Sequence, residues 1–104
     1  MTQETIHRAV NLLAQAASPT KIILFGSHAR SQAREESDLD FLVLEKKVSN
    51  RRAEIVRLLR VLEPYDIPAD IFVASEDFYD QWKDAPGTIL FEAAREGRVV
   101  YESR

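Results

Sequence analysis

Two aspartates, Asp38 and Asp40, flank a leucine at the start of an apolar run. Residues two apart in an extended strand point to the same face, so both carboxylates project together while Leu39 points the other way, into a core. Their α-carbons are then about 6.5 Å apart. Carboxylates at this spacing can bind a pair of divalent metal ions, which stabilise the attacking and leaving oxygens in phosphoryl transfer. We predict a metal site here, because two such carboxylates without a cation would repel each other.

A glycine-serine pair, Gly26 and Ser27, ends the preceding apolar run, and ten residues separate it from Asp38. Glycine lets the backbone turn sharply and approach a ligand closely, because it has no β-carbon. The Ser27 hydroxyl and the free N–H groups of a following helix start can bind the β- and γ-phosphates of a nucleotide. Arg30, one turn further on, could reach the same phosphates and stabilise a pyrophosphate leaving group. The alternative interpretation of Arg30 is an exposed surface arginine.

A third aspartate, Asp70, begins another apolar run and could lie beside the first two. Magnesium prefers such a site, with few carboxylates, several waters and the phosphates of the substrate. Asp70 would then hold the metal that acidifies an acceptor hydroxyl, and it could also take the proton. Its alternative role is that of an ordinary solvated residue at a strand end.

The apolar periodicity predicts elements that can position these residues. We predict helices over residues 4–17, 28–33, 50–62, 75–82 and 87–96, and strands over residues 21–25, 39–44, 70–73 and 98–101. Ser75 is the expected cap of its helix, and Gly97 fits a left-handed helix end. Three aromatic residues at helical spacing, Phe78, Tyr79 and Trp82, are expected in the core rather than at a partner surface. The alternation predicts an α/β (α+β) fold, in which a mixed central sheet of about four strands is flanked by helices.

The length of 104 residues predicts a single domain over residues 1–104. Hydrophobic residues make up 45% and charged residues 30%, which is typical of a globular protein. No apolar stretch approaches the ~20 residues that span a bilayer, so no membrane association is expected. The absence of cysteine and of a secretory signal predicts a cytoplasmic protein. A net charge of -3 argues against an extended nucleic-acid surface, although a nucleotide can bind where metal neutralises its phosphates.

The segment from Leu24 to Val43 resembles the signature of the minimal nucleotidyltransferases (MNT), members of the DNA polymerase beta superfamily. Their pattern is Gly-Ser followed, ten residues on, by Asp-x-Asp, met here at Gly26, Ser27, Asp38 and Asp40. Ala29-Arg30 corresponds to the Ala-Arg that is common in the family, and Asp70 to its later strand aspartate. The strong match covers residues 22–73, and residues 87–101 resemble the usual C-terminus. One departure is Ser31, where many relatives have glycine.

This resemblance implies a nucleotidyltransferase that moves a nucleoside monophosphate, AMP when the donor is ATP, to a hydroxyl group. Two magnesium ions, with manganese as an alternative, would be held by Asp38, Asp40 and Asp70. Family members of this size often pair with a small helical HEPN toxin and adenylylate a tyrosine on it, acting as its antitoxin. Two other hypotheses stay open: an antitoxin that neutralises by binding alone, and nucleotidyl transfer to a small molecule or RNA. Homo- or hetero-oligomers are both compatible with the sequence.

Overall fold

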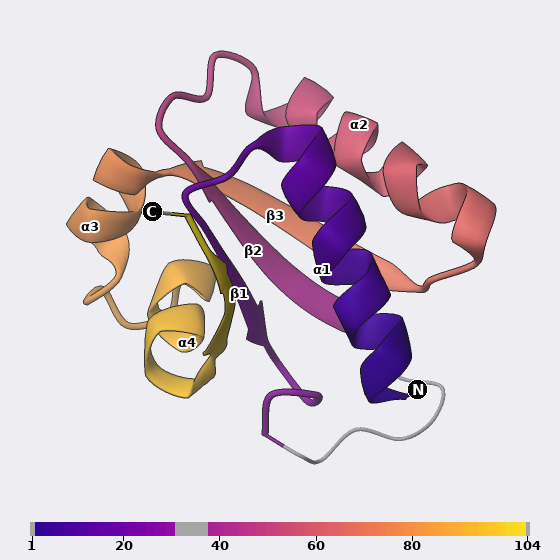
Figure 1. Cartoon of the computed structure of the whole chain (residues 1–104). Coiled ribbons are helices and arrows are strands. Elements are labelled where there is room, and N and C mark those ends of the chain that lie inside the picture. The colour runs from indigo at the N-terminus through magenta and orange to yellow at the C-terminus, as the bar shows by residue number, and fades with distance from the viewer. Residues whose placement is uncertain (1, 31–37, 104) are drawn as a thin grey trace.

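The computed structural model describes residues 2–30 and 38–103, with helices and strands interspersed along the chain (Figure 1). In chain order they are α1 (Gln3–Ala17), β1 (Lys21–Phe25), β2 (Leu39–Glu45), α2 (Arg51–Leu62), the short 3₁₀ helix η1 (Glu63–Tyr65), β3 (Ala69–Ser75), α3 (Glu76–Trp82), α4 (Ile89–Glu96) and β4 (Arg98–Glu102). None of the helices in these described ranges is both long enough and apolar enough to cross a membrane.

The four strands form one mixed sheet in the order β3-β2-β1-β4. β1 pairs antiparallel with β2 and with β4, whereas β2 and β3 run parallel. The parallel pair needs a crossover connection, and α2 supplies it. The predicted mixed sheet of about four strands flanked by helices is therefore confirmed.

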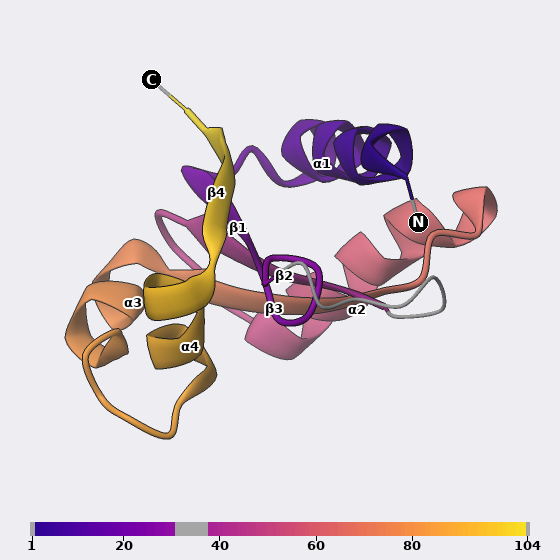
Figure 2. The same cartoon turned by 90° about the horizontal axis from the view of Figure 1, so that it is seen from below.

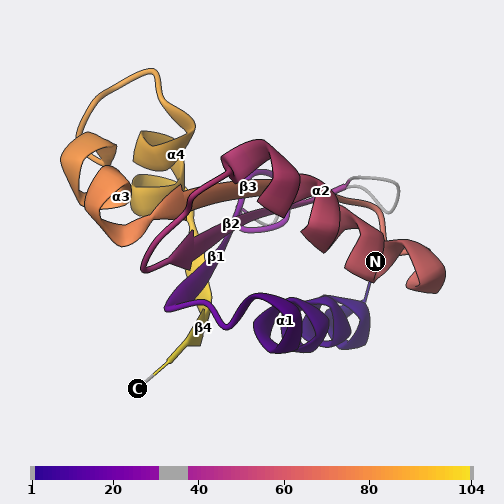
Figure 3. The same ribbon diagram turned by 90° about the horizontal axis from the view of Figure 1, so that it is seen from above.

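The helices cover the two faces of the sheet separately. α1 and α2 pack on one face, and α3 and α4 lie away from them on the other side, as the views from below and above show (Figures 2 and 3). Along β2, Phe41 and Val43 join the core beneath α1 and α2, while Leu42 and Leu44 join the core beneath α4. Because strand side chains alternate, Asp40 lies on the α4 face.

The segment after β1 differs from its prediction. A helix was expected over residues 28–33, but residues 27–30 form a turn with one helical hydrogen bond, in which Arg30 N–H donates to the Gly26 carbonyl at 3.2 Å. Residues 31–33 of that predicted helix, and with them Ser31, lie outside the described residues.

The helix ends confirm one predicted cap and correct another. Ser75 caps α3, as predicted, by accepting a hydrogen bond from Phe78 N–H at 3.1 Å. Gly97 ends α4 in an extended conformation (φ -79, ψ 163), so the predicted left-handed conformation is wrong. The glycine is needed for space instead, because a β-carbon there would collide with the Ala93 carbonyl and the Ile23 side chain.

The expectation that Phe78, Tyr79 and Trp82 lie in the core holds only for Tyr79, which packs against the core beneath α4. Phe78 and Trp82 are 43% and 40% exposed. Their rings lie 6.1 Å apart. The helix has only seven residues, and the rest of the fold covers these two rings only in part.

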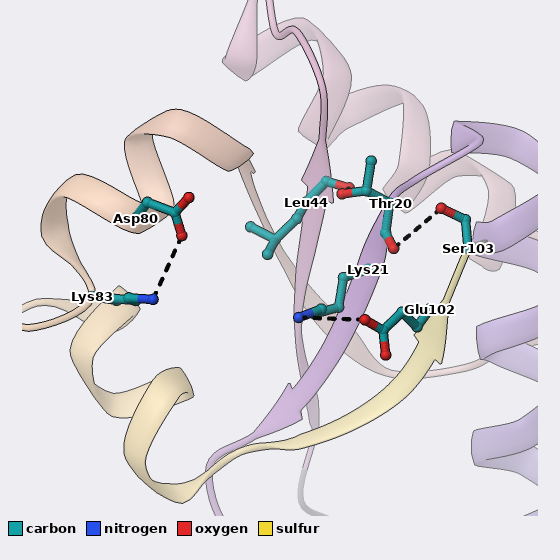
Figure 4. A network of polar contacts seen from close by, with 7 residues as sticks. All are labelled: Thr20, Lys21, Leu44, Asp80, Lys83, Glu102 and Ser103. Atoms are coloured by element: carbon teal, nitrogen blue, oxygen red, sulfur yellow. Dashed lines mark hydrogen bonds and ion pairs between the residues drawn. The ribbon is translucent and has the colours of Figure 1, made fainter.

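Polar contacts connect the start of β1 to its two neighbouring strands, β2 and β4 (Figure 4). Thr20 Oγ1 donates a hydrogen bond to the Leu44 carbonyl at 3.2 Å, and Ser103 N–H donates to the Thr20 carbonyl at 3.0 Å. Lys21 and Glu102 add an ion pair at 3.8 Å between β1 and the edge strand β4. These contacts hold the register that sets where β1 ends, at Gly26.

Candidate active site

The end of β1 lies directly beside the start of β2. The antiparallel register pairs Phe25 with Asp40, and Gly26 follows with a φ of +75°, in the left-handed region. A β-carbon on Gly26 would overlap Asp40 Oδ2 and lie 3.2 Å from its Cγ. The Asp40 carboxylate therefore rests against the backbone of this turn, and the turn requires glycine on two independent grounds.

Asp70 lies opposite Asp40 on the neighbouring strand. β2 and β3 are parallel, and their register pairs Asp40 with Asp70. Paired residues on adjacent strands point to the same face, and the strands are about 4.8 Å apart. Asp40 is half-buried and Asp70 exposed. Two carboxylates from separate strands are thus neighbours on the α4 face, beside the Gly26 turn.

Asp38 lies just before β2 and is exposed. Burial raises the pKa of Asp40 above its ordinary value, and the negative charges of Asp70, Glu92 and Asp38 raise it further, in that order. His28 has the opposite, lowering effect. Asp40 is therefore the centre of an acidic cluster whose members repel one another and would be stabilised by a cation.

Glu92, on α4, is a member of this cluster that the sequence analysis did not identify. It lies 52 positions after Asp40 in the chain, within the C-terminal residues 87–101, and the Gly-Ser and Asp-x-Asp spacing does not indicate it. The packing of α4 against the sheet brings it near Asp40.

Arg30 joins the turn to α4. Its Nη1 atom lies 2.9 Å from Glu96 Oε2 and 3.8 Å from Glu92 Oε1. The guanidinium is thus at the border of the acidic cluster, as a phosphate ligand would require, and it is paired with two carboxylates there. Ser27 is half-buried within the same turn.

The donor set suits a hard divalent cation in an open site. Among the described residues, no three His, Cys, Asp or Glu side chains converge as a complete metal-binding group. The two carboxylates in register, with Asp38 close by, provide oxygen ligands and leave positions for phosphates and waters, the coordination that magnesium prefers. The half-buried Asp40 carboxylate, which the charges of Asp70 and Asp38 repel, fits such an ion.

Solved structures of other proteins share this fold. The fold matches the structure of a candidate nucleotidyltransferase from Sulfolobus solfataricus with a TM-score of 0.67 and 19% identity, over 95% of this chain and 78% of that one. It also matches a structure of tri-AMPylated Shewanella oneidensis HEPN toxin in complex with MNT antitoxin, with a TM-score of 0.61 and 16% identity, over 99% of this chain and 74% of that one. The fold is that of nucleotidyltransferases.

The chain belongs to the family described as "Polymerase beta, Nucleotidyltransferase", whose family model matches residues 8–104. One relative, a candidate protein adenylyltransferase of Methanocaldococcus jannaschii, is 35% identical over 54 residues, which are 52% of this chain and 54% of that protein. A second candidate protein adenylyltransferase of that organism is 51% identical over 39 residues, which are 38% of this chain and 26% of that protein. The aligned part thus spans about half of the first relative and a quarter of the second.

Proposed function

We propose that this protein transfers AMP from ATP to a hydroxyl group of a partner protein, a tyrosine of a HEPN-type toxin, and thereby acts as its antitoxin. The observation that carries the proposal is the in-register pair Asp40 and Asp70 beside the Gly26 turn. The family to which the chain belongs supports the proposal, and so do the relatives named as candidate protein adenylyltransferases. Further support comes from the fold match to a structure in which an AMPylated HEPN toxin is bound to an MNT antitoxin.

Each part of the site has a proposed role. Gly26 and Ser27 bind the triphosphate, since the turn brings backbone close to a ligand without a side chain in the way. Asp38, Asp40 and Asp70 would hold magnesium or manganese, which when bound neutralises phosphate charge and acidifies the acceptor hydroxyl.

In the proposed reaction, the acceptor oxygen attacks the α-phosphorus and forms a new P–O bond. The bond from the α-phosphorus to the oxygen that bridges to the β-phosphate breaks, and pyrophosphate leaves with that electron pair. Asp70 is exposed on β3, which lies on the side of β2 away from β1, and in this proposal it receives the hydroxyl proton.

The test incubates the purified protein with its HEPN-type partner, ATP and magnesium, and then measures the mass of the intact partner. We expect one or more added AMP groups, located on tyrosine by peptide sequencing. A partner that keeps its unmodified mass would contradict the proposed activity. Modification of a small molecule or RNA instead of the partner would favour transfer to that acceptor.

A non-enzymatic antitoxin is separated from an enzyme by a double variant, Asp38→Asn with Asp40→Asn. We expect this variant to lose both AMP transfer and neutralisation of the toxin, because the metal-binding carboxylates are gone. A matched control, Asp77→Asn with Asp84→Asn, makes the same change of charge at exposed positions outside the site. Neutralisation that survives the first double variant would show that binding alone suffices.

A further inference from the structure

An apolar groove of about 400 Å³ lies at the β3 edge of the sheet. We call it the β3 groove. It is lined by residues of β2, β3, α2, α3 and the start of α4: Leu42, Phe72, Val73, Ala74, Phe78, Thr88, Ile89, Leu90, Arg51 and Ile55. Leu42, Phe72 and Leu90 in its lining belong to the face that carries Asp40 and Asp70, whereas Val73 and Ile55 belong to the core on the opposite face. Its volume lies at the lower end of the range for pockets that bind small groups.

Two residues that line the groove are close to the carboxylates along the strands. Leu42 and Phe72 are paired in the sheet, two residues beyond Asp40 and Asp70, and therefore point to the same face. Two strand residues span about 6.6 Å, roughly the length of a phenolic side chain. A ring lying over Leu42 and Phe72 can thus place a hydroxyl beside the carboxylates.

The groove lies on the acceptor side of the proposed reaction. Its strand residues come from β2 and β3, whereas the Gly26–Ser27 turn ends β1, on the far side of β2 from β3. In an in-line displacement, the attacking oxygen and the leaving pyrophosphate lie on opposite sides of the phosphorus. If the turn binds the triphosphate, the attacking group arrives from the side of β3.

The charges along the groove also select its occupant. The end of the groove at Leu42 and Phe72 is two strand positions from Asp40 and Asp70, and their negative charges disfavour an unscreened anionic group there. A smaller cavity of about 140 Å³ extends the other end towards Ser75, and Arg51 lines both cavities. The arrangement suits a neutral ring with a hydroxyl at the acidic end, followed by an acidic side chain that can pair with Arg51.

We propose that the β3 groove binds the ring of the acceptor tyrosine, within a partner segment that carries a nearby acidic residue. This inference rests on the proposed function, because it assigns the acceptor side of the same site. Phe78 and Ile89 would determine acceptor specificity, since they are 43% and 41% exposed and form the open wall of the groove.

The kinetic test compares Phe78→Ser and Ile89→Ser with a control, Val99→Ser. Val99 is 53% exposed on β4, at the opposite edge of the sheet. With the HEPN-type partner as acceptor, we expect each groove variant to raise the KM for the partner roughly tenfold or more. The KM for ATP should stay within about twofold, and the control should match the wild type in both constants. All three positions are exposed enough for folding to survive, which circular dichroism checks.

An unchanged partner KM would overturn the inference, and so would a rise in the KM for ATP, which would assign the groove to the nucleobase. A second measurement does not depend on activity: N-acetyl-L-tyrosinamide is titrated into the protein and amide shifts are followed by NMR. We expect saturable shifts at Phe72, Phe78 and Ile89, abolished by Phe78→Ser. Their absence would overturn the groove assignment even if AMP transfer occurs, whereas shifts without AMP transfer would refute only the proposed function.

Discussion

Replacing Gly26 by alanine tests whether the glycine turn keeps the Asp40 carboxylate in the position that catalysis needs. At φ +75°, an alanine loses roughly 1–2 kcal/mol relative to its ordinary conformation. Its β-carbon would also overlap Asp40 Oδ2 and lie 3.2 Å and 3.4 Å from Asp40 Cγ and Cβ. Either the carboxylate or the turn must therefore move.

Misplacement of a reacting group by about 1 Å can cost a hundredfold in rate. Gly26→Ala should accordingly lower kcat/KM for AMP transfer about a hundredfold, which corresponds to about 2.7 kcal/mol of activation free energy. The assay is the initial rate of pyrophosphate release with partner and ATP, measured beside a urea unfolding curve.

Gly87→Ala is the matched control. Gly87 has a similar φ of +89°, but nothing lies within 4 Å of an added β-carbon. It should lose a similar 1–2 kcal/mol of stability and keep nearly full activity. A folded Gly26→Ala variant with wild-type kcat/KM would refute a role of Gly26 in positioning the Asp40 carboxylate. An equal loss of activity in Gly87→Ala would refute it too.

Two further predictions concern charged groups. If Arg30 must leave Glu96 to bind phosphate, Arg30→Ala should raise the KM for ATP, while Glu96→Gln should lower it a few-fold; equal KM values in both variants would contradict this. At the far end of β2, burial and a hydrogen bond with Glu54 raise the pKa of Glu45 from 4.5 to about 8, so its proton stabilises the folded state. That contribution is complete below pH 4.5 and is lost as the pH rises through 8. Urea midpoints should therefore fall between pH 5 and 9 more steeply in the wild type than in Glu45→Gln, and parallel curves would refute the assignment.

Local sequence was enough to predict the parts of the fold that depend on neighbouring residues. The alternation in residues 39–44 places Asp40 on one face, and the structure confirms this alternation. The cap at Ser75 and the glycine turn at Gly26 were predictable for the same reason, since both depend on the conformation of a few consecutive residues. The roles of Gly26, Ser27 and the three aspartates in catalysis remain predictions.

Only the tertiary structure decided which side chains meet across segments. The pairing of Asp40 with Asp70 depends on the parallel register of β2 and β3, which α2 separates in the chain. The packing of α4 brings Glu92 towards Asp40 and places Glu96 against Arg30. Likewise, the exposure of Phe78 depends on which side of α3 meets the sheet. Periodicity specifies an apolar stripe but not its partner, because strand register and helix docking arise from contacts between residues far apart in sequence.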